Sequence, residues 1–230
     1  MLFIRNGDRF SAETTLSAPC DIAGYNWRVR IWCTVFLVAL ASIACRKPPA
    51  KVVVPDVFRV KFETSQGDLV VEARREWAPH GVDRFYELVR MKYFDEGRFF
   101  RVLPGFIAQF GVHRNMDVHA TWSKLFIVDD QPRLKNLRGT LAFAQSGPST
   151  RATEIFINLA DNAALDEQHF VPFAKVIQGM EAADRFYSGY GEMRPEGKLM
   201  DRGRVENETN EYLVQRFPKL DYIVRAQIVP

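Results

Sequence analysis

Apolar and charged positions alternate from Phe58 to Phe62, and a second β-rich run follows a turn signal at residues 65–68 that reads Ser-Gln-Gly-Asp. A period of two is typical of half-buried β-strands, and a glycine-containing turn between two such runs predicts a hairpin. The pattern then changes. Apolar residues of the stretch 77–94 recur at steps of three and four, with charged residues between them and Pro79 near the start. That spacing predicts an amphipathic helix that buries one face against a sheet.

Short runs rich in aromatic and β-branched residues fill most of the chain after residue 98. They are separated by Gly, Pro, Asn and Asp, which is the pattern of many short strands joined by turns. Two further helices are expected, over residues 179–191 and 206–217, and Pro218 ends the second. The pattern as a whole predicts a mainly β protein built as a sandwich or a barrel. We expect its later strands at residues 99–103, 106–112, 139–144, 154–159, 170–177 and 221–229.

Composition and charge narrow the functional classes. Of the 230 residues, 47% are hydrophobic and 26% are charged, which is ordinary for a globular protein. The formal net charge is only +3, and the basic residues are interleaved with acidic ones, so we expect no nucleic-acid partner. The four histidines are scattered, and no Cys/His spacing typical of a metal site occurs. We therefore expect neither a metal nor another cofactor.

The segment before the domain has the pattern of an export signal. Arg28 and Arg30 precede an uncharged apolar run over residues 31–44, which is too short to span a membrane comfortably. Basic residues before such a run and small residues after it are typical of a signal peptide. The run ends in Ser-Ile-Ala-Cys, which resembles a bacterial lipoprotein cleavage box and implies a lipid on Cys45. Plain secretory cleavage and an uncleaved membrane anchor remain open alternatives.

These boundaries divide the chain into three parts. Residues 1–45 are a leader, residues 46–56 are a tether in which three prolines disfavour helix, and residues 57–230 are the folded domain. The polar prefix over residues 1–27 is unusual for a signal peptide, and we interpret it as a translation start assigned too early. Only Cys45 of the three cysteines would remain after processing, so the mature domain is expected to hold no disulfide.

Three segments in order resemble the sequence blocks of the cyclophilin family. The first is Phe-Phe-Arg-Val-Leu-Pro-Gly-Phe-Ile-Ala-Gln-Phe-Gly at residues 99–111, the second spans residues 138–158, and the third spans residues 165–181. The resemblance covers about residues 57–187. It implies a closed eight-stranded antiparallel barrel capped by two helices, and peptidyl-prolyl cis-trans isomerase activity. Phe100 stands where the family usually has His, a change that we expect to affect the lining of the groove more than the chemistry.

The chemistry implied by the resemblance explains a lone guanidinium in an apolar segment. Resonance gives the X-Pro bond partial double-bond character and a rotation barrier of about 18–20 kcal/mol. At the twisted transition state this resonance is lost, and the proline nitrogen becomes a hydrogen-bond acceptor. A permanently charged donor, Arg101, would stabilise that state over the planar one. No nucleophile, general base or metal is needed.

The same resemblance assigns the remaining site residues. Arg101, Phe106 and Gln109 form the catalytic group, with Gln109 bonding the substrate carbonyl and orienting the arginine. Gln145 and Glu154 stand where Asn and Gln are common in the family. The substrate-binding positions are Ile107, Phe156, Leu165 and His169, which with Phe106 form the proline pocket, and Ala144 and Gln145, whose backbone pairs with the substrate peptide.

Two functions remain as candidates at this point. One is an isomerase that accelerates folding in the bacterial cell envelope, on the periplasmic side, acting as a monomer on proline-containing peptides and unfolded protein clients. The other is a non-catalytic chaperone or assembly module that only binds proline-containing peptides. Arg101 with Gln109 favours the isomerase, because a binder needs neither.

Overall fold

The computed structural model describes residues 53–192 and 201–230. The predicted leader, its lipidation site at Cys45 and the first part of the tether lie outside these residues. Of the helices that the structure describes, none combines the length and the apolar character needed to cross a membrane.

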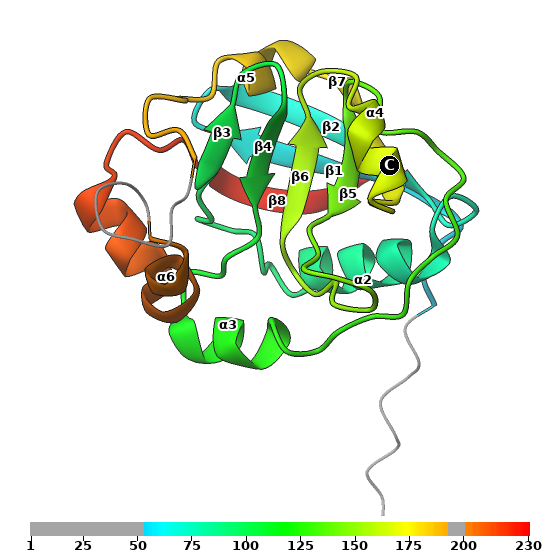
Figure 1. Ribbon diagram of the computed structural model, residues 1–230, viewed down its shortest axis with the longest axis horizontal. Coiled ribbons are helices and arrows are strands. Elements are labelled where there is room, and N and C mark those ends of the chain that lie inside the picture. The colour runs from blue at the N-terminus through cyan, green and yellow to red at the C-terminus, as the bar shows by residue number, and fades with distance from the viewer. Residues whose placement is uncertain (1–52, 193–200) are drawn as a thin grey trace, which may run out of the picture. The chain divides into compact units, whose positions relative to one another are not determined.

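Eight antiparallel strands form one strongly curled sheet (Figure 1). Its order is β3-β4-β6-β5-β7-β2-β1-β8. The two ends of the sheet approach each other, because Arg98 and Tyr222 form an isolated bridge and the amide of Phe99 donates to the carbonyl of Asp221 at 2.9 Å. The predicted eight-stranded antiparallel fold is confirmed. The strands are β1 (Val57–Thr64), β2 (Gly67–Arg74), β3 (Arg101–Leu103), β4 (Ile107–Phe110), β5 (Thr140–Phe143), β6 (Ile155–Asn158), β7 (Pro172–Gln178) and β8 (Ile223–Val229).

β1 and β8, the first and last of the eight strands in sequence order, lie side by side in the sheet. β1 and β2 form the predicted hairpin, paired from Val57 opposite Arg74 to Thr64 opposite Gly67. Gly67 has a φ of +120°, a conformation that glycine adopts without the steric cost of a Cβ. The other edge of β1 pairs with β8, so the two ends of the described domain meet in the sheet.

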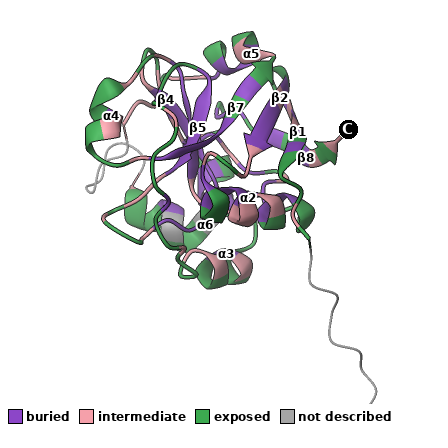
Figure 2. Ribbon diagram, turned by 90° about the vertical axis from the view of Figure 1, so that its right-hand side faces the viewer, coloured by how far each residue is buried: buried purple, intermediate pink, exposed green. Residues whose placement is uncertain are grey.

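Aromatic rings make up much of the core on the inside of the curled sheet. The strands of the sheet are coloured mostly as buried in Figure 2. Every second residue of β1 from Phe58 on is buried, as the alternation predicted. Phe85 of α2 (Pro79–Arg90) packs against Phe173 of β7, with 5.0 Å between the ring centroids. Burial of a Phe side chain stabilises the fold by about 1.5–3 kcal/mol, so each of these rings contributes substantially to stability. Other fully buried rings of the core are Phe62, Tyr93, Phe94, Phe99, Phe110 and Phe143.

The helices agree only partly with the sequence pattern. α2 is confirmed, and its buried face contains Val82, Phe85 and Val89. α5 (Met180–Asp184) is much shorter than the helix predicted over residues 179–191, while α6 (Arg202–Arg216) begins earlier than predicted, with Asp201 as its N-cap. Two short helices, α3 (Met116–Trp122) and α4 (Ala163–Glu167), were not predicted, because fewer than two turns leave no visible period.

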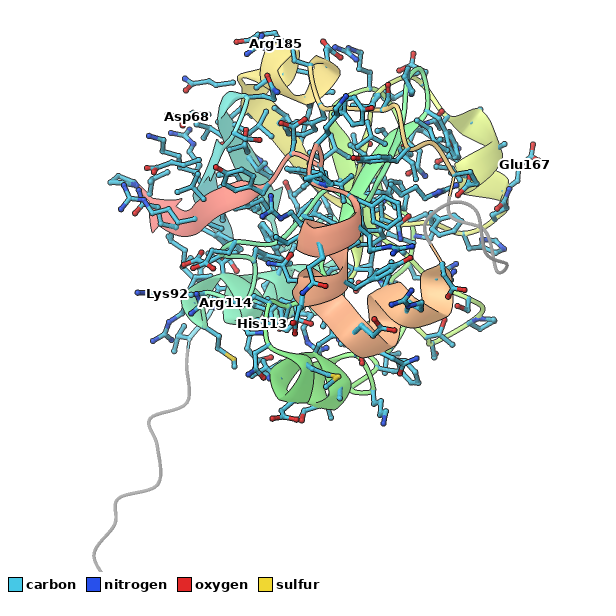
Figure 3. The ribbon with its side chains drawn as sticks, turned by 90° about the vertical axis from the view of Figure 1, so that its left-hand side faces the viewer. Asp68, Lys92, His113, Arg114, Glu167 and Arg185 are labelled. Atoms are coloured by element: carbon cyan, nitrogen blue, oxygen red, sulfur yellow. The ribbon has the colours of Figure 1, made fainter. Side chains whose placement is uncertain are left out.

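A second, smaller hydrophobic cluster fastens α6 to the barrel. Its buried members include Phe100 from the segment before β3 and Leu213 from α6. Phe100 is only 1% exposed, so it belongs to this cluster and does not line the groove as we expected from the sequence. Figure 3 looks onto this side of the molecule, with α6 lying across it. The other buried members are Val112, Val205, Tyr212 and Leu220, and Tyr190 and Phe217 pack against them.

Candidate active site

A cross-strand row of side chains defines the site. Arg101 of β3 lies opposite Gln109 of β4, Gln109 lies opposite Phe156 of β6, and Phe156 lies opposite Ala142 of β5. Directly opposed residues of antiparallel strands project from the same face of the sheet. Their neighbours in sequence project to the other face and belong to the main core, so the row lies on the outside of the barrel. Those neighbours are Val102, Ala108, Ile157 and Leu141.

Arg101 is held at the end of this row by Gln109. Nη1 of Arg101 donates a hydrogen bond of 3.2 Å to Oε1 of Gln109, and Nε2 of Gln109 donates one of 2.7 Å to Oε2 of Glu154. The side chain of Arg101 is 19% exposed, and its guanidinium carbon lies 5.7 Å from the ring centroid of Phe106. The predicted catalytic group of Arg101, Phe106 and Gln109 is therefore assembled in one place.

Glu192 also binds Arg101, which the sequence did not predict. Nε of Arg101 donates to Oε1 of Glu192 at 2.5 Å, and Nη2 donates to Oε2 at 2.7 Å. Glu192 follows α5 and lies 91 residues after Arg101, outside the three motifs that identified the other site residues. No periodicity or motif in the sequence marks it. The guanidinium therefore lies between two carboxylates, with Glu192 bound directly and Glu154 bound through Gln109.

An apolar cluster lies beside the arginine. Phe170 packs edge-on against Phe156, with 5.6 Å between ring centroids. Phe170 was not among the predicted site residues, although it directly follows His169 in the third motif. The buried members of the cluster are Ile107, Ala142, Phe156 and Leu165, and Phe106, Ala144 and Phe170 pack against them.

The remaining predicted residues lie at the edges of the cluster. His169 is exposed, and its φ of 60° places it in a left-handed turn. Nε2 of Gln145 donates to the carbonyl of Gln168 at 3.1 Å, with a longer contact of 3.4 Å to the carbonyl of His169. Ala144 and Gln145 follow the end of β5, and the amide of Ala144 donates to the carbonyl of Glu154 at 2.9 Å. Gln145 is thus tied to the turn that carries His169.

A pocket of about 340 Å³ adjoins the row on the side of Glu154. Nδ1 of His119, one of the lining residues, is joined to the hydroxyl of buried Tyr93 by a hydrogen bond of 2.9 Å. Burial raises the pKa of the Tyr93 phenol well above its ordinary value of 10.0, so this phenol stays neutral at physiological pH. Residues from several elements line the pocket, among them His119, Lys124, Gln145, Thr150, Glu154 and Arg202.

The geometry presents a fixed cationic donor beside an apolar hollow. Arg101 offers the planar N–H donors of a cationic guanidinium. The cluster around Phe156 offers apolar surface to a ring or an aliphatic side chain. Among the described residues, no group of three or more His, Cys, Asp or Glu side chains is arranged to hold a metal ion. The arrangement suits a ligand that has an apolar ring next to a hydrogen-bond acceptor.

Comparisons with known proteins agree on one family. The sequence model described as "Cyclophilin type peptidyl-prolyl cis-trans isomerase/CLD" matches residues 59–206. The chain is 36% identical over 132 residues to "Peptidyl-prolyl cis-trans isomerase A" of Dickeya dadantii, covering 55% of this chain and 69% of the relative. It is 33% identical over 132 residues to "Peptidyl-prolyl cis-trans isomerase" of Acinetobacter baylyi, covering 55% of this chain and 70% of the relative.

Solved structures show the same fold. A cyclophilin-type peptidyl-prolyl cis-trans isomerase from Cryptosporidium parvum superposes with a TM-score of 0.53 at 21% identity, covering 76% of this chain and 98% of that one. A second structure of the same protein, determined in the presence of the dipeptide Ala-Pro, also gives a TM-score of 0.53 and covers 75% of this chain and 99% of that one. At this identity the likeness shows the architecture.

Proposed function

This chain belongs to the cyclophilin-type peptidyl-prolyl cis-trans isomerase family, and on that premise we propose that it rotates X-Pro bonds on the face built around Arg101. The observation that supports this site is the cross-strand row, which sets the guanidinium of Arg101 beside the apolar cluster of Phe156. The proline ring would lie on that cluster, and its nitrogen would come within reach of the guanidinium.

The proposed mechanism stabilises the twisted amide. In the planar ground state the lone pair of the proline nitrogen is delocalised, whereas in the twisted state it can accept a hydrogen bond. Arg101 donates to it, and the stronger interaction in the twisted state lowers the barrier. A charge-assisted hydrogen bond is worth about 1.5–3 kcal/mol, which corresponds to a rate factor of roughly 10- to 150-fold. Binding of the proline ring and of the flanking carbonyl supplies the remainder of the rate enhancement.

Gln109 would serve both the substrate and the arginine. Its Oε1 accepts from Arg101, and its Nε2 has one hydrogen directed to Glu154. An amide nitrogen carries two hydrogens, so the other one can bind the substrate carbonyl. Glu154 fixes the orientation of this amide, because an inverted amide would place Oε1 against a carboxylate. The carboxylate of Glu154 therefore leaves the second amide hydrogen of Gln109 available to the substrate.

The substrate chain would run along the end of β5. The backbone at Ala144 and Gln145 borders both the apolar cluster and the 340 Å³ pocket, so an extended peptide can pair there while its proline reaches Phe156. Short proline-containing segments of unfolded proteins fit this description.

An assay on the wild type and on Arg101→Ala tests the function. In a protease-coupled assay with an Ala-Pro peptide, we expect the wild type to be active and the variant to lose most activity while it still binds the peptide. A wild type without activity that nevertheless binds the peptide would instead support the non-catalytic chaperone or assembly role.

We further propose that the enzyme works in the bacterial cell envelope, on the periplasmic side, held by a lipid on Cys45. The apolar run over residues 31–44 and the following Cys45 support this location. Metabolic labelling with a radioactive fatty acid should mark the wild type and should not mark Cys45→Ala. A wild type that takes up no label, or a variant labelled equally well, would contradict lipidation at this residue.

A further inference from the structure

We propose that Glu192 is a positioning residue for Arg101, which fixes the guanidinium so that its remaining donors face the substrate. This inference rests on the isomerase function proposed above. It adds a residue that lies outside the three sequence motifs and comes from the segment that follows α5.

The count of donors on Arg101 supports this role. An arginine side chain has five N–H donors in one plane. Among the described residues, Glu192 takes one on Nε and one on Nη2, and Gln109 takes one on Nη1. Two donors remain, one on each terminal nitrogen. The guanidinium is therefore held along its Nε edge and on Nη1, and what is left for a ligand is one hydrogen from Nη1 and one from Nη2.

The position of Glu192 is built into the fold. Tyr190, two residues before it, packs against the second hydrophobic cluster and lies edge-on to Phe217, with 5.0 Å between ring centroids. The chain then turns at Gly191, where φ is +66° and the amide donates to the carbonyl of Ser188 at 3.0 Å. A left-handed conformation of this kind favours glycine.

Both members of the ion pair are anchored by the same cluster. Phe100, which directly precedes Arg101, is a buried member of it, and Tyr190, two residues before Glu192, packs against it. Helix α6 supplies most of the cluster's remaining apolar side chains. The cluster therefore sets the distance between the two charged residues, so that the pair does not depend on two freely moving side chains.

Restraint of this arginine has a direct benefit for the reaction. A long side chain loses rotamer freedom when it is fixed in one geometry, and a guanidinium that is already fixed avoids this loss at the transition state. A carboxylate partner also offsets part of the positive charge of the guanidinium, and this weakens its stabilisation of the twisted state. Side-on pairing through Nε and Nη2 keeps the carboxylate away from the two remaining donors, so we expect orientation to outweigh the loss of charge.

The variant Glu192→Gln tests the proposal. It keeps the shape of the side chain and one acceptor, but it loses the charge and the bidentate geometry. The matched control is Glu181→Gln, which removes the same charge from an exposed position on α5. Exchange spectroscopy by NMR on an Ala-Pro peptide, over a range of peptide concentrations, gives kcat and KM separately. The Nε–H resonance of Arg101 reports the orientation of its side chain.

We expect kcat to fall by about two- to fivefold in Glu192→Gln, because the pair is partly exposed, with KM changed by less than about twofold. The Nε–H resonance of Arg101 should move or broaden in this variant only, and Glu181→Gln should match the wild type. An unchanged kcat would overturn the proposal. A higher kcat would also overturn it, and would show that Glu192 competes with the substrate for the donors of Arg101.

These outcomes are separate from a failure of the proposed function. A wild type without isomerase activity would remove the function itself, before any variant is compared. An active wild type whose kcat does not depend on Glu192 would leave the function in place and remove only the positioning role. The side chain of Glu192 is 45% exposed, so we expect the variant to fold, and its thermal midpoint checks this.

Discussion

Arg101 and Gln109 lie opposite each other on β3 and β4, and Nη1 of the arginine donates a hydrogen bond of 3.2 Å to the glutamine Oε1. The backbone ladder between the two strands fixes this pair, because opposed residues on one face are neighbours by construction. The sheet register therefore determines that Arg101 lies next to Gln109, the residue that orients it. Several expectations for variants depend on this arrangement.

Arg101→Lys should be a poor substitute despite its positive charge. An ammonium group cannot bind Glu192 side-on and Gln109 at the same time with planar geometry, so its donors would not be aimed at the proline nitrogen. We expect kcat/KM to fall by about 10- to 100-fold in a protease-coupled assay, the loss of one well-placed charge-assisted hydrogen bond. Activity close to that of the wild type would show that charge alone is sufficient.

Phe170→Ala should weaken substrate binding more than it slows the chemical step. The ring of Phe170 packs edge-on against Phe156 within the apolar cluster. Such an aromatic contact contributes about 0.5–1.5 kcal/mol beyond burial, so we expect KM to rise by roughly 2- to 10-fold with a smaller change in kcat. Leu137→Ala, an exposed apolar position outside the cluster, serves as the control. Equal kinetics for both variants would remove Phe170 from the binding surface.

Phe100→His should destabilise the domain, although His is the usual family residue at this position. Phe100 is buried in the second cluster, where an imidazole would leave polar nitrogens without water. We expect a loss of about 1–3 kcal/mol in the free energy of unfolding, measured by urea denaturation. Phe100→Leu, which stays apolar, should lose less. A His variant as stable as the wild type would mean that the cluster admits water.

Asp130→Ala should be among the most destabilising single substitutions. Its side chain is fully buried, binds Nη1 of Arg151 at 3.1 Å, and accepts hydrogen bonds of 2.9 Å from the amides of His80 and Gly81 at the start of α2. Removing it leaves the guanidinium of Arg151 without this buried partner, at a cost of about 3–5 kcal/mol in the free energy of unfolding. Asp129→Ala, at a half-exposed partner of the same arginine, should cost about 1 kcal/mol or less. Thermal or denaturant unfolding of both variants measures the two losses, and equal losses would contradict the prediction.

Stability should fall as the pH drops below about 6.5, in part because of His113. Burial lowers the pKa of the His113 imidazole below its ordinary value, and this effect outweighs the contact of Nδ1 with the carbonyl of Asn115 at 3.1 Å, which acts to raise the pKa. The unfolded chain then binds the proton more readily than the folded one. This contribution is complete above the unfolded pKa and is lost as the pH falls through the folded one. The difference in unfolding free energy between wild type and His113→Gln should shrink from pH 7 to pH 5; a constant difference would contradict this.

The strands and most of the site could be predicted because both are local patterns. Alternation located β1, and the turn signal followed by a β-rich run located β2. The motif around Arg101 brought Gln109 and Ile107 with it, because β3 and β4 are close in sequence and pair with each other. Phe170 and Glu192 could not be found in this way. The first depends on which way a turn at His169 directs the next ring, and the second on a segment whose course is set by the packing of α6.

Phe100 shows how a local interpretation can fail. At the level of the motif it is a substitution beside the catalytic arginine, and its effect was expected in the groove. In the folded chain it is buried in the same hydrophobic cluster as Tyr212 and Leu213 of α6, more than 100 residues away in sequence. The role of Phe100 depends on residues of the second cluster that are distant in sequence. The sequence near position 100 contains no pattern that indicates them.

The pairing of β1 with β8 has a consequence for synthesis. A ribosome makes β1 early and β8 last, so a nascent chain that lacks residues 223–229 leaves one side of β1 with bare amides and carbonyls. Such an open strand invites pairing with other chains. The pairing of β1 with β8 can form only after residues 223–229 have emerged, so this edge of β1 stays open while the strands between them are made.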